Sequence, residues 1–217
     1  MSTRFADLFP PRRGRTHEVT GAGAHAFAAL LAGRLKGDVV WLIEAWRSDT
    51  LNPLGIFPFC DPSKLLMVHA PSPTDLLAAM EEALRSGSVA LVVAEVSEAL
   101  SLKAGRRLQL AAEAGRVTGL VIIPEGKGSN AAQTRWRAEP LPPAQTTLSD
   151  HRPGPPRWRW SLVKNKAGAT PAWDVMWTLS GKEDRHDEYA DIHTGKTGHL
   201  SVVAASGERA VSAPLPL

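Results

Sequence analysis

The 217-residue sequence contains a single cysteine, Cys60, and a single tyrosine. One cysteine cannot build an internal disulfide framework or a cysteine-based zinc site, which fits a reducing compartment. The apolar runs are no longer than a strand, and the first 14 residues hold no apolar stretch of signal-peptide length. These absences predict a cytoplasmic protein without membrane association and leave association with the nucleoid open.

Neither positive nor negative charge is in large excess. The chain carries 25 Lys and Arg against 22 Asp and Glu, so its formal net charge at pH 7 is only +3. This balance does not predict a protein that coats nucleic acid through its overall charge, and DNA would need a local basic patch. With 43% apolar residues, the length suits one α/β domain and is short for two.

Short apolar runs alternate with amphipathic segments between residues 16 and 123. This rhythm predicts parallel strands joined by helical crossovers. The expected strands are 16–19, 39–44, 65–69, 89–93 and 117–123. Their near-continuous apolar character predicts a sheet that is covered on both faces. We therefore expect an α/β fold with a mostly parallel, twisted sheet flanked by helices.

Three helices are expected between these strands. The first presents Phe27 and three leucines on one face, and the second has an apolar stripe that follows a capping Ser72 and a proline. The third spans about residues 103–114, and Gly115 is expected to end it.

The sequence pattern changes after residue 123. A glycine-containing loop at 124–130 and a strand-like segment at 135–138 precede residues 140–156, which hold six prolines and predict an irregular connector. Alternation at 157–164 and 173–179 predicts antiparallel strands on the C-terminal side. The expected organisation is an N-terminal extension at 1–15, a core at 16–180 and a polar tail at 181–217 with an edge strand at 200–204.

Four segments resemble the RecA core, and they occur in the order of that family. They are the strand and glycine turn at 18–21, the L-N-P-L-G run at 51–55, the stretch A-L-R-S-G-S-V-A-L-V-V-A-E at 83–95, and V-K-N-K at 163–166 followed by W-D-V-M-W at 173–177. V-K-N-K between a proline-rich connector and a tryptophan strand is the most specific of them. The resemblance covers residues 16–180 and implies a RecA-like fold.

Two further segments resemble the ImuA family, the short RecA-like companions of ImuB in bacterial damage-induced mutagenesis. They are R-R-L-Q-L-A-A-E-A-G at 106–115 and T-R-W-R at 134–137. The resemblance implies an accessory role in SOS-induced translesion DNA synthesis. Its implied partners are RecA and/or ImuB, with an error-prone DnaE-type polymerase as an indirect partner. A cell-division inhibitor of the SulA kind is the alternative from another functional class.

The position of the phosphate loop lacks the residues that bind nucleotide. A working loop needs G-x-x-x-x-G-K-[ST], because its amides cradle phosphates, its lysine neutralises them and its hydroxyl holds magnesium. Counted from Gly21, the second glycine falls at Ala26, the lysine at Phe27 and the hydroxyl residue at Ala28. We therefore expect no ATP hydrolysis and no cofactor.

The two acidic positions of the family are also altered. Glu95 ends a strand where the resemblance places the magnesium-organising acid, and Trp46 stands where it places the carboxylate that activates water. Without the lysine, Glu95 is expected to have a structural role or to form an ion pair. No metal site is expected.

Lys164 and Lys166 share one face of a predicted strand. In the resemblance, the matching lysines reach across a subunit boundary toward a neighbour's ATP, where cations stabilise phosphate charge. An edge strand with solubilising lysines would give the same pattern. The first interpretation leads to the hypothesis that the chain docks on RecA and caps or perturbs its filament.

Five cations surround the loop where recombinases hold single-stranded DNA, and tryptophans are interleaved with them. The alternation at 157–160 places both tryptophans on one face and both arginines on the other, as in a half-buried strand. We expect core tryptophans beneath an exposed basic face, with weak, salt-sensitive DNA contact as a secondary hypothesis. The cations are Lys127, Arg135, Arg137, Arg157 and Arg159.

Overall fold

The computed structural model describes residues 4–143, 154–179 and 198–206. Within these ranges the strands form one nine-stranded sheet in the order β3-β2-β4-β5-β1-β6-β7-β8-β9. The first six strands in this order run parallel, and β7, β8 and β9 are antiparallel to their neighbours. The strands are β1 (Thr16–Thr20), β2 (Val39–Glu44), β3 (Leu65–Ala70), β4 (Leu91–Glu95), β5 (Thr118–Ile122), β6 (Thr134–Leu141), β7 (Arg157–Asn165), β8 (Ala172–Leu179) and β9 (Gly198–Ser206).

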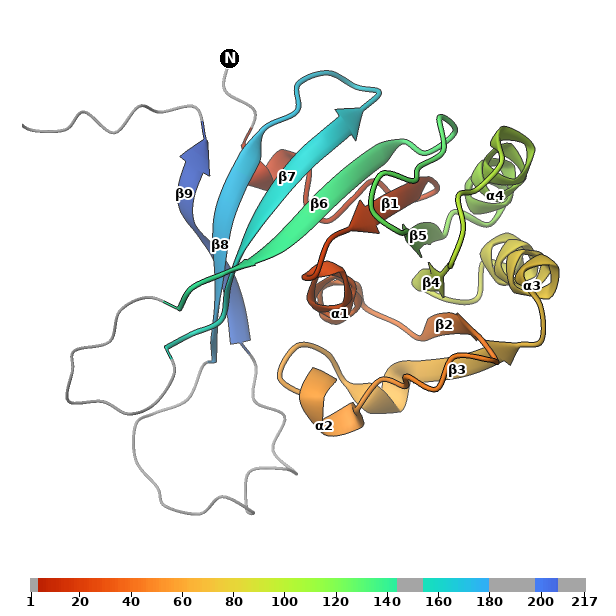
Figure 1. Cartoon of the computed structure of the whole chain (residues 1–217), viewed down its shortest axis with the longest axis horizontal. Coiled ribbons are helices and arrows are strands. Elements are labelled where there is room, and N and C mark those ends of the chain that lie inside the picture. The colour runs from red at the N-terminus through yellow and green to blue at the C-terminus, as the bar shows by residue number, and fades with distance from the viewer. Residues whose placement is uncertain (1–3, 144–153, 180–197, 207–217) are drawn as a thin grey trace, which may run out of the picture.

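The helices cover the two faces of the sheet, as Figure 1 shows. The sheet curls around α1, whereas α3 and α4 lie side by side on the opposite face. Each face has its own apolar core. The expected fold class, a mostly parallel sheet flanked by helices with antiparallel strands added, is therefore confirmed. The helices are α1 (Ala24–Arg34), α2 (Pro53–Ile56), α3 (Pro73–Ser86) and α4 (Leu102–Gly115), with 3-10 turns η1 (Phe5–Asp7) and η2 (Pro62–Lys64).

Local capping explains where α3 begins and ends. The Ser72 hydroxyl accepts a hydrogen bond from the backbone N–H of Asp75, and Pro73 occupies the first helical position. Gly87 follows the helix with a left-handed φ of 71°, a conformation that glycine adopts without steric cost.

Several boundaries differ from the sequence-based expectation, most of them by one or two residues. β4 begins at Leu91 and not at residue 89, although the backbone N–H of Ala90 already donates to O of Asp38, the residue before β2. α4 includes Gly115, and the left-handed residue after it is Arg116, with φ 53°. β6 continues through Pro140 into the expected connector. The expected edge strand at 200–204 is present as the longer β9.

The first residues of the described chain belong to the core. Phe5 and Phe9 stack with ring centroids 5.3 Å apart, and Phe9 lies 5.5 Å from Phe27 of α1. The centre of the expected connector, at 144–153, and most of the polar tail lie outside the described residues. None of the helices in the described ranges has the length and apolarity required to cross a membrane.

Candidate functional site

The loop that joins β1 to α1 is pressed against β6. The backbone N–H of Gly23 donates to Ala138 O at 2.9 Å. A Cβ atom on Gly21 would lie 2.4 Å from the same oxygen, and one on Gly23 would lie 2.9 Å from Cδ1 of Trp158. A loop amide in the position that could cradle a phosphate is therefore already bonded within the chain.

The side chain at the lysine position of this loop lies in the interior. Phe27 is fully buried, with its ring 4.6 Å from that of Trp160 and 5.4 Å from that of Trp136, measured between centroids. Ala28 is fully buried as well, and Ala26 is partly buried. Offset and tilted rings at these separations attract one another, so this part of α1 stabilises the core and carries no charge.

Glu95 is almost fully buried and is held by three donors from three segments. Its Oε1 accepts from the Trp41 indole N–H at 2.8 Å, and its Oε2 lies 3.0 Å from both His25 Nε2 and Arg47 Nη1. Burial raises the pKa of Glu95, but the His25, Trp41 and Arg47 contacts outweigh burial and hold the pKa below its ordinary value. The carboxylate is thus ionised and paired within the chain.

The surroundings of Glu95 do not resemble a metal centre. No three His, Cys, Asp or Glu side chains in the described residues are grouped so that they could hold a metal ion. Trp46 projects from the loop after β2 with 67% of its surface exposed. Glu95 is therefore an isolated buried acid, and Arg47 of the same chain already neutralises its charge.

Lys164 and Lys166 are turned toward their own chain. Lys164 Nζ donates to Ser129 O at 3.0 Å, and Lys166 Nζ donates to Ala131 O at 2.6 Å. Burial lowers the pKa of Lys164, as do the nearby charges of Lys166 and Arg135, while Glu18 acts in the opposite direction. Both lysines therefore support the loop at 129–131.

The DNA-contact residues of the hypothesis are spread along β6, β7 and the adjoining loop, with Arg135 and Arg157 at opposite ends of the β6–β7 pair, and three of the five are paired with carboxylates. Arg135 Nε lies 2.8 Å from Oε2 of the buried Glu18, and Arg137 pairs with Glu125. Arg159 binds Asp174 through two nitrogens, at 2.7 and 3.0 Å. Lys127 is exposed, and Arg157 has a buried Nε for which the described residues offer no partner. DNA contact remains a prediction.

Sequence reasoning did not find His25, Trp41 and Arg47. The signal for Trp41 was an indole N–H within a buried strand, because such a donor needs an acceptor close by. The signal for Arg47 was a cation directly after a strand that ends beside Glu95. Neither signal identifies its partner, since these contacts join residues 48 to 70 positions apart.

The sheet order and the β1–α1 crossover together define an α/β protein with a mostly parallel sheet flanked by helices, in which Phe27 of the first crossover helix is fully buried. Protein ImuA of Caulobacter vibrioides, in strains NA1000 / CB15N and CB 15, is 36% identical to this chain over 222 residues. The alignment covers 90% of this chain and 86% of each relative. The chain belongs to the ImuA family.

Two other comparisons add little. No protein-family model matches the sequence. The crystal structure of SulA from Pseudomonas aeruginosa aligns with a TM-score of 0.42 and 24% identity, and covers 50% of this chain and 97% of that one. This likeness is too distant to carry a functional argument.

Proposed function

We propose that this chain is a non-catalytic RecA-like accessory protein of SOS-induced translesion DNA synthesis, and that it binds RecA and/or ImuB and modulates RecA filaments. Membership of the ImuA family supports this role. Protein surfaces are then its means of action, with a DnaE-type polymerase as an indirect partner.

The observation that carries the proposal is the chemistry of the β1–α1 crossover. ATP hydrolysis requires a cation at the terminal phosphates and a hydroxyl that holds magnesium. Phe27 and Ala28 supply neither, and the N–H of Gly23 is bonded to β6. Glu95, the remaining acid, is paired with Arg47 and hydrogen-bonded to His25.

We further propose that Lys164 and Lys166 take part in docking on an ATP-bearing RecA protomer. An ammonium group has three N–H donors, and each lysine uses one on a carbonyl of its own loop. The remaining donors can reach an external phosphate while the loop stays in place. The RecA protomer would then contribute a competent nucleotide site to the contact, and this chain would offer none to the next protomer. Filament growth would therefore stop at this chain.

The test measures binding of the full-length chain to immobilised RecA, with and without ATP and single-stranded DNA, and to immobilised ImuB from the same organism. We expect saturable binding to at least one of them. Absence of binding to both would overturn the proposal.

Paired variants test the docking lysines separately. Lys164→Ala with Lys166→Ala should weaken RecA binding at least about tenfold, equivalent to about 1.4 kcal/mol, and should abolish any effect on RecA ATPase. Lys164→Arg with Lys166→Arg retains the charges and should keep most of the binding. Lys36→Ala with Lys103→Ala, which alters exposed lysines elsewhere, should have no effect. Unchanged binding by the alanine pair would refute the assignment while leaving the accessory role intact.

A further inference from the structure

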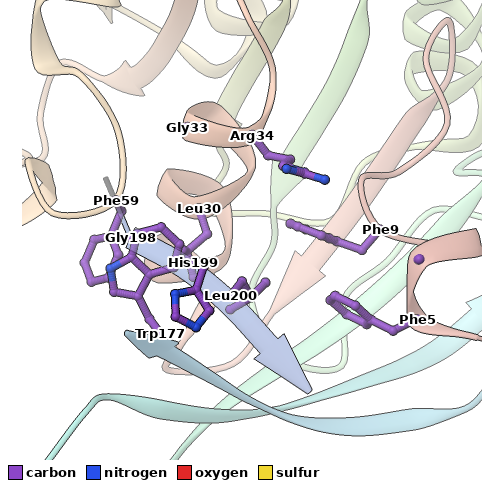
Figure 2. Close-up of a pocket in the computed structure, with 11 residues that line it drawn as sticks. Phe5, Phe9, Leu30, Gly33, Arg34, Phe59, Trp177, Gly198, His199 and Leu200 are labelled. Carbon is purple, nitrogen blue, oxygen red and sulfur yellow. The ribbon is translucent and has the colours of Figure 1, made fainter. Parts of the chain in front are cut away.

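A pocket of about 350 Å³ opens between η1, the end of α1 and the β8–β9 edge of the sheet. Figure 2 shows the rings of Phe5, Phe9 and Trp177 around it, with Phe59 beside Trp177 and with Leu200 of β9 at its floor. Its volume lies in the range of sites that hold a small ligand or one large side chain. Aromatic and aliphatic side chains form part of its wall, so an apolar group of an occupant can pack against them.

Arg34 and His199 are the lining residues with polar side chains other than tryptophan, and Arg34 carries a positive charge. Arg34, in the last turn of α1, is exposed, and no carboxylate in the described chain lies within salt-bridge distance of it. No lining residue is acidic. The charge complementary to this pocket is therefore negative.

The strand beside the pocket is an unprotected sheet edge. β9 is the last strand of the sheet, and in the described chain only β8 pairs with it. Edge strands are usually protected by charged residues or proline, but residues 198–206 contain neither. Val202 and Val203 are 40% and 42% exposed. Such an edge can accept a further strand through main-chain hydrogen bonds.

We propose that β9 and the pocket form one docking site for an extended segment of a partner protein. The segment pairs with β9 as an added strand, inserts a large apolar side chain among Phe5, Phe9 and Trp177, and places a carboxylate against Arg34. A second copy of this chain fits less well, because its own β9 has no acidic residue to offer Arg34.

The probe is a phage-displayed library of random ten-residue peptides, selected on the full-length chain. We expect selected peptides to share one large apolar residue and a nearby Asp or Glu. A fluorescein-labelled consensus peptide should slow deuterium exchange of the β9 amides. Exchanging its acid for Lys should weaken binding at least about tenfold.

Variants of the chain locate the site. Ala6→Trp fills the pocket from η1, Arg34→Glu reverses its charge, and Val203→Lys protects the edge; each should weaken the consensus peptide at least about tenfold. Lys36→Glu reverses an exposed charge outside the pocket and should leave binding unchanged. Thermal unfolding verifies that each variant is folded.

Three outcomes would overturn the proposal. The first is that the library enriches no peptide, and the second is that the enriched peptides bind all three variants as well as they bind the wild type. The third is that sedimentation shows a dimer that Val203→Lys dissociates. The last outcome would identify β9 as a self-association edge.

Discussion

Replacing Phe27 by alanine tests whether this residue has become part of the core. Its ring is fully buried and lies 4.6 to 5.5 Å, between centroids, from the rings of Trp160, Trp136 and Phe9. Truncating a buried phenylalanine costs about 3–5 kcal/mol, because transfer free energy is lost and a cavity remains. For a chain of this size, Tm should fall by roughly 6–20 °C.

The assay is urea unfolding followed by tryptophan fluorescence, with Leu110→Ala as the control. Leu110 is 65% exposed, so its truncation should change the free energy of unfolding by less than about 0.5 kcal/mol. A loss below about 1 kcal/mol for Phe27→Ala would refute the reasoning, since a residue that packs this core cannot be removed without cost.

The remaining predictions concern buried polar groups and DNA. Burial lowers the pKa of His17 from 6.5 to about 4. As the pH falls, the unfolded chain therefore takes up a proton at this histidine before the folded chain does, and about 3 kcal/mol of folding stability should be lost between pH 6.5 and 4. Urea unfolding across this range should show that loss, and His17→Gln should lack it; equal pH dependence in both proteins would contradict the prediction. Glu95→Gln removes the charge that Arg47 and His25 contact and should lower the free energy of unfolding by about 2 kcal/mol, and an unchanged value would show that the cluster contributes nothing. Binding to single-stranded DNA, measured by fluorescence anisotropy, should be weak and should fall steeply with salt; an affinity independent of salt would rule out the basic face.

Elements with a strong local signal were predictable from the sequence. β2 was expected at 39–44 and spans Val39–Glu44, because a run of buried β-branched and aromatic residues has no competing helical pattern. The Ser72 cap was predictable for the same reason, since its partners lie within three residues. Gly115 was assigned the wrong role. A Cβ atom there would lie 1.9 Å from Leu84 O, so glycine permits close packing of α3 on α4, and Arg116 adopts the left-handed turn.

The residue types at the phosphate-loop positions could be predicted from the sequence, whereas the contacts between distant side chains could not. Counting from Gly21 was enough to find Phe27 and Ala28 at the phosphate-loop positions. The pairing of Arg135 with Glu18 joins residues 117 positions apart, and no sequence period encodes it. The sequence therefore predicted an exposed basic face, whereas Arg135, Arg137 and Arg159 of that face contact acids of the same chain, and Arg135 also a carbonyl.

The central claim, that the β1–α1 crossover does not hold nucleotide, is tested most directly by titrating MgATP into the full-length chain in a calorimeter. We predict no saturable heat with a Kd below about 1 mM, with RecA as the positive control. Stoichiometric binding of MgATP to this chain would contradict the account.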